Sequence, residues 1–216
     1  EQVIEHISGF MFHNNCENRD FGLFDKMLGT IEERFGHLLH KVEWVSLGGG
    51  IHFTGEGYPL DAFCARLKAF SEKYGVQVYL EPGEAAITNS ASLEVTVLDT
   101  LYNGKHLAVV DSSIEAHMLD LLIYRLNAKM APCAGEYTYM VCGKSCLAGD
   151  IFGEYQFDRP LAIGDRLSFI DAGGYTMVKK NWFNGLKMPA IAVRQLDGSV
   201  EVVREFGFDD YLQSLS

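Results

Sequence analysis

Three features that could do chemistry each follow a short apolar run of the sequence. They are a histidine, a glycine triplet and a glutamate: His13, residues 48–50 and Glu81. Glycines let backbone N–H groups approach a phosphate closely, and successive N–H groups can form an anion-binding nest. Taken singly, the triplet is also compatible with a flexible turn, the histidine with a structural role and the glutamate with an exposed turn. Their joint placement at three strand ends favours one shared site.

Alternating strands and helices would carry these features to one edge of a sheet. Apolar runs typical of buried strands cover residues 7–13, 42–47 and 76–80. Apolar residues at helical spacing predict helices over residues 21–35 and 59–74, with Gly36 and Gly75 as their stops. This βαβαβ order implies parallel strands with crossover helices, and such folds bind ligands at the C-terminal ends of the strands.

The second part of the chain reads as β structure. Short runs of β-forming residues, separated by turn signals, cover residues 93–101, 106–110, 137–142, 166–170, 190–194 and 200–204. We therefore expect a largely antiparallel β domain over residues 91–216, after an α/β part over residues 1–90. Three parallel strands leave an open sheet edge, so we expect the first part to continue a larger barrel or sheet whose earlier strands are absent from this chain.

Two loops of this β region add candidate groups. Cys146 lies among small residues in CGKSCLAGD, where its thiol could act as an acid, although free cysteines are commonly buried apolar residues. Tyr175 follows two glycines in DAGGYT, where its hydroxyl could bind a phosphate or its ring could pack.

Composition limits the partners. The net charge of -11 argues against nucleic acid and favours a cationic ligand. We expect no membrane span and no signal peptide, because no apolar run is long enough and the first residues lack a basic region. Five scattered cysteines do not predict a disulfide framework or a structural zinc site, so we expect a cytoplasmic protein without a metal.

The ordered set of motifs resembles the fold type III decarboxylases that use pyridoxal phosphate, a family that includes ornithine, diaminopimelate and carboxynorspermidine decarboxylases. SLGGGIHFT, EPGEA, CLAGD and GGYTMVKKNWFNG look most like the members that act on carboxynorspermidine and carboxyspermidine. The resemblance implies the last strands of a TIM-like β/α-barrel of the alanine racemase type, followed by a C-terminal antiparallel β domain. It also implies a homodimer with shared active sites.

The resemblance also assigns roles. It gives cofactor contacts to His13, Gly49, Gly50, Glu81, Gly83 and Tyr175. Glu81 would pair with the pyridine nitrogen, His13 would stack on the ring and take part in catalysis, and Cys146 of the partner subunit would protonate the carbon that loses CO2. No position matches the family's cofactor lysine, so we expect that lysine on the missing barrel segment and place Lys41 at the surface.

Glu84 is the informative departure, because several relatives carry arginine after EPG. A carboxylate there favours an ammonium group over an anion. We therefore expect Glu84 to bind an amine of a polyamine-like cationic substrate, with Asp120 and Asp150 as further candidates.

The expected activity is decarboxylation of carboxynorspermidine and carboxyspermidine. The alternatives are another decarboxylase of this family, such as one for diaminopimelate, and a non-catalytic fragment that lacks the lysine.

Overall fold

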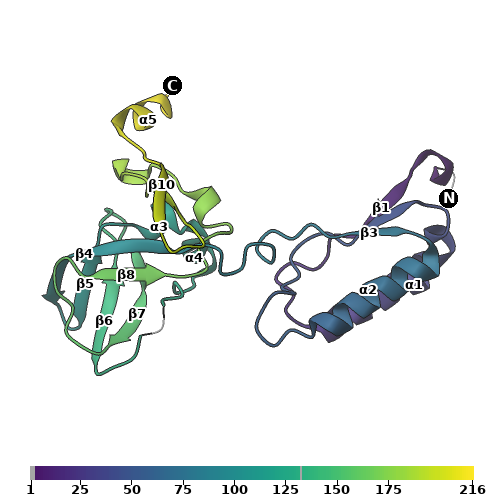
Figure 1. Cartoon of the computed structure of the whole chain (residues 1–216), viewed down its shortest axis with the longest axis horizontal. Helices are drawn as coiled ribbons and strands as arrows, with labels where there is room; N and C mark the ends of the chain where they lie inside the picture. Colours follow the sequence, from purple (N-terminus) through teal and green to yellow (C-terminus); the bar gives the residue numbers. More distant parts are fainter. Residues whose placement is uncertain (1–2, 132) are drawn as a thin grey trace. The chain divides into compact units, whose positions relative to one another are not determined.

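The computed structural model describes residues 3–131 and 133–216, and the chain divides into two compact units, residues 1–88 and 89–216 (Figure 1). The predicted boundary after residue 90 lies two residues beyond this division. Each unit has its own apolar core.

The first unit is a three-stranded parallel sheet with two long helices. Its elements are η1 (Ile4–His6), β1 (Gly9–Met11), α1 (Phe21–Leu39), β2 (Trp44–Ser46), α2 (Leu60–Tyr74) and β3 (Gln77–Tyr79). The strand order is β1-β2-β3, with Val45 of β2 opposite Phe10 on one side and Val78 on the other. Figure 1 shows α1 and α2 side by side along this sheet. The predicted βαβαβ order is confirmed.

The two helix ends differ in how well the sequence predicted them. α2 ends at Gly75, which adopts the left-handed conformation with φ 70°, as expected of a glycine stop. The prediction that Gly36 ends α1 is wrong, because the helix continues to Leu39. A Cβ on Gly36 would lie 3.3 Å from the hydroxyl of Tyr74, so this glycine allows α1 and α2 to pack closely.

The second unit is built on a five-stranded sheet of order β7-β6-β5-β4-β8. Its elements are β4 (Leu93–Tyr102), β5 (His106–Val110), α3 (Ile114–His117), α4 (Leu119–Tyr124), β6 (Tyr137–Cys142), β7 (Ile151–Phe157), β8 (Arg166–Phe169), η2 (Met177–Lys179), η3 (Phe183–Gly185), β9 (Ile191–Arg194), β10 (Val200–Arg204) and α5 (Phe208–Gln213). β9 and β10 form a separate two-stranded sheet.

The prediction of an antiparallel domain needs one correction. β5 and β6 run parallel, because the segment between them contains α3 and α4 and returns the chain to the same end of the sheet. The other three pairings of this sheet are antiparallel. Strand β7 was not predicted, because Gly153, at φ 151°, interrupts the apolar alternation. Among the described residues, no helix is long and apolar enough to cross a membrane.

Candidate active site

The C-terminal ends of β1, β2 and β3 are joined by hydrogen bonds. The N–H of Gly49 donates to Nδ1 of His13 at 3.2 Å, and the hydroxyl of Ser46 donates to Oε1 of Glu81 at 2.6 Å. The N–H of Glu81 also donates to the carbonyl of Gly48 at 2.9 Å. The structure therefore brings together the three features that the sequence placed at strand ends. Ser46, which orients Glu81, was missed, although it is the last residue of β2 and lies two residues before Gly48.

Residues 48–50 must be glycines because the loops after β1 and β3 pass very close to them. A Cβ on Gly48 would lie 2.4 Å from Nδ1 of His13, and a Cβ on Gly49 would lie 2.4 Å from the carbonyl oxygen of Glu81. Gly50 has φ 83°, and its Cβ would lie 2.6 Å from the carbonyl oxygen of Asn15. The side chains missing from the triplet thus make room for the loops after β1 and β3.

The free backbone donors near these strand ends suit a phosphate. Among the described residues, no acceptor pairs with the N–H groups of Gly50, Gly83 or Glu84. The N–H of Gly49 differs, because it is already bonded to His13. Oε2 of Glu81 has no hydrogen-bond partner in the described part of the chain, so it could face a pyridine nitrogen. These groups fit pyridoxal phosphate, and the cofactor contact expected of Gly49 stays a prediction.

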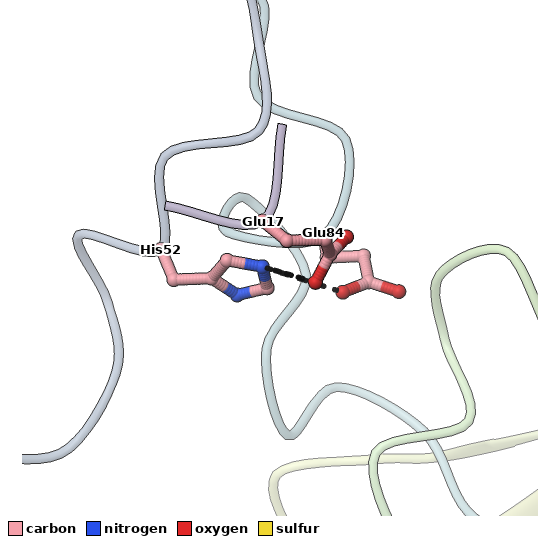
Figure 2. A group of neighbouring side chains, drawn as sticks. All are labelled: Glu17, His52 and Glu84. Carbon is pink, nitrogen blue, oxygen red and sulfur yellow. Dashed lines mark hydrogen bonds and ion pairs between the residues drawn. The ribbon is translucent and has the colours of Figure 1, made fainter. Parts of the chain in front are cut away.

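Glu84 lies in a cluster that the sequence did not predict in full. Nε2 of His52 lies 3.2 Å from Oε2 of Glu17 and 3.9 Å from Oε2 of Glu84 (Figure 2). The histidine is largely buried, while both carboxylates are exposed. His52 comes two residues after Gly50, which is the signal that could have drawn attention to it. The cluster could attract a cation, and its donor atoms also lie close enough for a metal ion, so the absence of a metal stays a prediction.

Asp120 and Tyr175 meet through a lysine in the second unit. Nζ of Lys179 donates to Oδ1 of Asp120 at 2.6 Å and lies 4.9 Å from the ring centroid of Tyr175. The hydrogen bond from Lys179 to Asp120 raises the pKa of the lysine. A cationic substrate group that binds Asp120 must therefore compete with Lys179, a residue to which the sequence analysis assigned no role.

Asp150 is buried at the base of the Cys146 loop. Its side chain accepts the N–H of Ile114 at 2.7 Å and the N–H of Ser145 at 2.9 Å, one at each carboxylate oxygen. Only 4% of the residue is exposed. This geometry favours a positioning role over the substrate contact expected for Asp150. Cys146 itself is exposed.

His117 is buried at the end of α3, just before the helix α4 that carries Asp120. Its Nδ1 lies 2.8 Å from the hydroxyl of Ser112, and burial lowers its pKa to about 4, so the ring is neutral at neutral pH. Its Nε2 is buried without a hydrogen-bond partner among the described residues.

Comparison with known proteins identifies the class to which this fold and site belong. Residues 16–173 match the family described as pyridoxal-dependent decarboxylase, C-terminal sheet domain. The chain therefore belongs to the pyridoxal-dependent decarboxylases.

Within this family, the chain is similar to decarboxylases whose names refer to polyamine-like compounds. The chain is 63% identical to a carboxynorspermidine/carboxyspermidine decarboxylase of Herminiimonas arsenicoxydans, over 99% of this chain and 59% of the relative. It is 41% identical to a carboxyaminopropylagmatine decarboxylase of Synechocystis sp., over 97% of this chain and 55% of the relative. The crystal structure of carboxynorspermidine decarboxylase from Campylobacter jejuni, complexed with norspermidine, has a TM-score of 0.90 and 37% identity. That match covers 96% of this chain and 60% of the other. The chain thus spans less than two thirds of the length of these relatives.

Proposed function

We propose that this chain is part of an enzyme that decarboxylates carboxynorspermidine and carboxyspermidine with pyridoxal phosphate. The observation that carries the proposal is the 63% identity to the Herminiimonas enzyme over nearly the whole chain. The joined strand ends of the first unit support it, because they combine a carboxylate, an imidazole and free backbone donors. The products would be norspermidine and spermidine, which makes this a step of polyamine biosynthesis.

The residues at the strand ends would hold the cofactor. Pyridoxal phosphate supplies a protonated ring that accepts the electron pair released as CO2 leaves. Glu81, oriented by Ser46, would keep a negative charge beside the ring nitrogen. His13, oriented by Gly49, would place its imidazole face against the ring. The N–H groups of Gly50, Gly83 and Glu84, together with the hydroxyl of Tyr175, would bind the phosphate.

Acidic side chains would select a cationic substrate. Glu84 would bind an ammonium group, and the nearby carboxylate of Glu17 adds to the negative potential at that position. Asp120 would bind a second ammonium group after displacing Lys179. An amino acid with a distal carboxylate, such as diaminopimelate, would be repelled by Glu84.

Assembly and location complete the proposal. The barrel of which these strands are the last part, and the lysine that binds the cofactor, would lie on the remainder of a longer protein. Two copies would share their active sites, so that Cys146 of the partner subunit donates a proton to the carbon that has lost CO2. A reducing cytoplasm suits five cysteines that are all free in the structure.

Borohydride reduction of the full-length protein tests the cofactor assignment. We expect an absorbance band at the edge of the visible range that is lost on reduction. Peptide mapping should then find the added cofactor mass on a lysine outside these 216 residues. Failure of the full-length protein to bind pyridoxal phosphate would contradict the assignment, and so would a label on a lysine within this segment.

A further inference from the structure

The loop that carries Cys146 is tied down on both sides of the cysteine. It connects β6 to β7, and its first and last residues are joined by the N–H of Gly143, which donates to the carbonyl of Asp150 at 2.8 Å. Within the loop, the N–H of Ser145 donates to the Asp150 carboxylate and the N–H of Cys146 donates to Oδ1 of Asn184 at 3.1 Å. The backbone at the cysteine is therefore fixed while its side chain remains exposed.

Asn184 is itself held in an uncommon conformation. It has φ 60° and ψ 16°, in the left-handed region that asparagine tolerates better than most residues. The segment just before it is anchored to α3, because Asn181 donates through its side chain to the carbonyl of Glu115 at 3.1 Å and through its N–H to the carbonyl of Ala116 at 2.8 Å. The amide oxygen of Asn184 is thus presented from a fixed segment.

Asp150 anchors the other side of the loop to the same helix. Its carboxylate accepts the N–H of Ile114, the first residue of α3. A Cβ on Gly143 would lie 2.2 Å from Oδ1 of Asp150, so glycine is needed for the carboxylate to reach this position. Asp150 and the segment that carries Asn184 are therefore both hydrogen-bonded to α3. Helix α3 thus fixes the position of the Cys146 loop.

We propose that Asn184 is a positioning residue that holds the backbone of Cys146, with Asp150 as the second support, so that the exposed thiol is directed at the reacting carbon. The inference rests on the proposed function for the role of the thiol. The hydrogen bond itself concerns only the second unit and can be tested without turnover.

Two substitutions at Asn184 separate the hydrogen bond from the backbone conformation. Asn184→Gly keeps the left-handed backbone and removes the acceptor, whereas Asn184→Asp keeps an acceptor oxygen at the same distance along the side chain. Asn103→Gly, in the exposed turn between β4 and β5, is a matched control for the change from asparagine to glycine. Cys146→Ala serves as the reference for complete loss of the thiol.

The first measurement is hydrogen–deuterium exchange of the Cys146 amide in full-length protein. Loss of one hydrogen bond should speed this exchange about tenfold in Asn184→Gly. Asn184→Asp and Asn103→Gly should exchange at the wild-type rate. Wild-type exchange in Asn184→Gly, or exchange in Asn184→Asp as fast as in Asn184→Gly, would overturn the proposed contact.

The second measurement is the fate of the carbon that loses CO2. If the Cys146 thiol were misplaced, the proton would instead reach the cofactor carbon that is joined to the substrate nitrogen. Water would then break the bond between that nitrogen and the substrate carbon, which would release an aldehyde and pyridoxamine phosphate, and the fraction of turnovers that end this way is the aborted fraction. We expect Asn184→Gly to raise this aborted fraction about tenfold while KM changes less than twofold, and Asn184→Asp to restore normal product. An aborted fraction equal to that of the wild type in Asn184→Gly, when Cys146→Ala raises it, would overturn the positioning role.

The two measurements also separate this inference from the proposed function. A wild-type enzyme that does not decarboxylate carboxynorspermidine would refute the proposed function and, with it, the role of the contact in proton delivery. Amide exchange would still decide whether Asn184 holds the Cys146 backbone.

Discussion

At the scale of single residues, the sequence predicted the chemical groups better than their contacts. His13 and Glu81 could be selected because each ends an apolar run. Their hydrogen bonds to Gly49 and Ser46 could not be predicted, because they depend on the distances between neighbouring strands. The same limit explains Asp150, whose acidic type suggested a substrate contact and whose burial is set by folding of the loop onto α3.

Replacement of Glu84 by glutamine tests the choice of substrate. Glu84→Gln removes a negative charge beside Glu17 and His52, so we expect KM for carboxynorspermidine to rise about fivefold, with a smaller change in kcat. Steady-state kinetics of the full-length enzyme at low and high salt measure this effect, which should shrink at high salt. Glu33→Gln on the exposed side of α1 is the control and should leave KM unchanged. An unaltered KM in Glu84→Gln would remove this residue from the substrate site.

At the scale of elements, periodicity located most helices and strands of the chain. Two of the misses involve a glycine whose structural role differs from the one expected. Gly36 permits close packing of α1 on α2 and does not end the helix. Gly153 lies inside β7 and interrupts the alternation of apolar and polar residues by which a strand is recognised in a sequence. The parallel pairing of β5 with β6 could not be predicted from turn signals, because it follows from the path of the chain through α3 and α4.

Alanine substitution distinguishes a glycine that is required by close packing from one that is not. In Gly49→Ala, the new Cβ would meet the carbonyl oxygen of Glu81, so we expect the free energy of unfolding to fall by about 1–3 kcal/mol and cofactor affinity to fall with it. In Gly29→Ala, inside α1, nothing lies within 4 Å of the new Cβ, and we expect a gain of about 0.5–1 kcal/mol. Denaturant unfolding and cofactor titration of both variants measure these changes. Equal stability of the two variants would contradict the close approach at Gly49.

At the scale of the whole molecule, the two compact units carry different parts of the account. The first holds the strand-end groups that fit the cofactor, and the second holds the Cys146 loop and the Asp120–Lys179 pair. Composition and net charge predicted a protein suited to cationic ligands, while only the ordered set of motifs indicated a decarboxylase. Carboxynorspermidine and carboxyspermidine differ by one methylene, so the preference between them is worth only about 1–3 kcal/mol. No residue of the sequence indicates which of the two is preferred.

The most direct test of the central claim is the ratio of kcat/KM for carboxynorspermidine to that for diaminopimelate, measured with the full-length enzyme loaded with pyridoxal phosphate. Release of CO2 reports both reactions under the same conditions. The account predicts a ratio of about one hundred or more, because the acidic site pairs with ammonium groups and repels a distal carboxylate. Equal or faster turnover of diaminopimelate would contradict it.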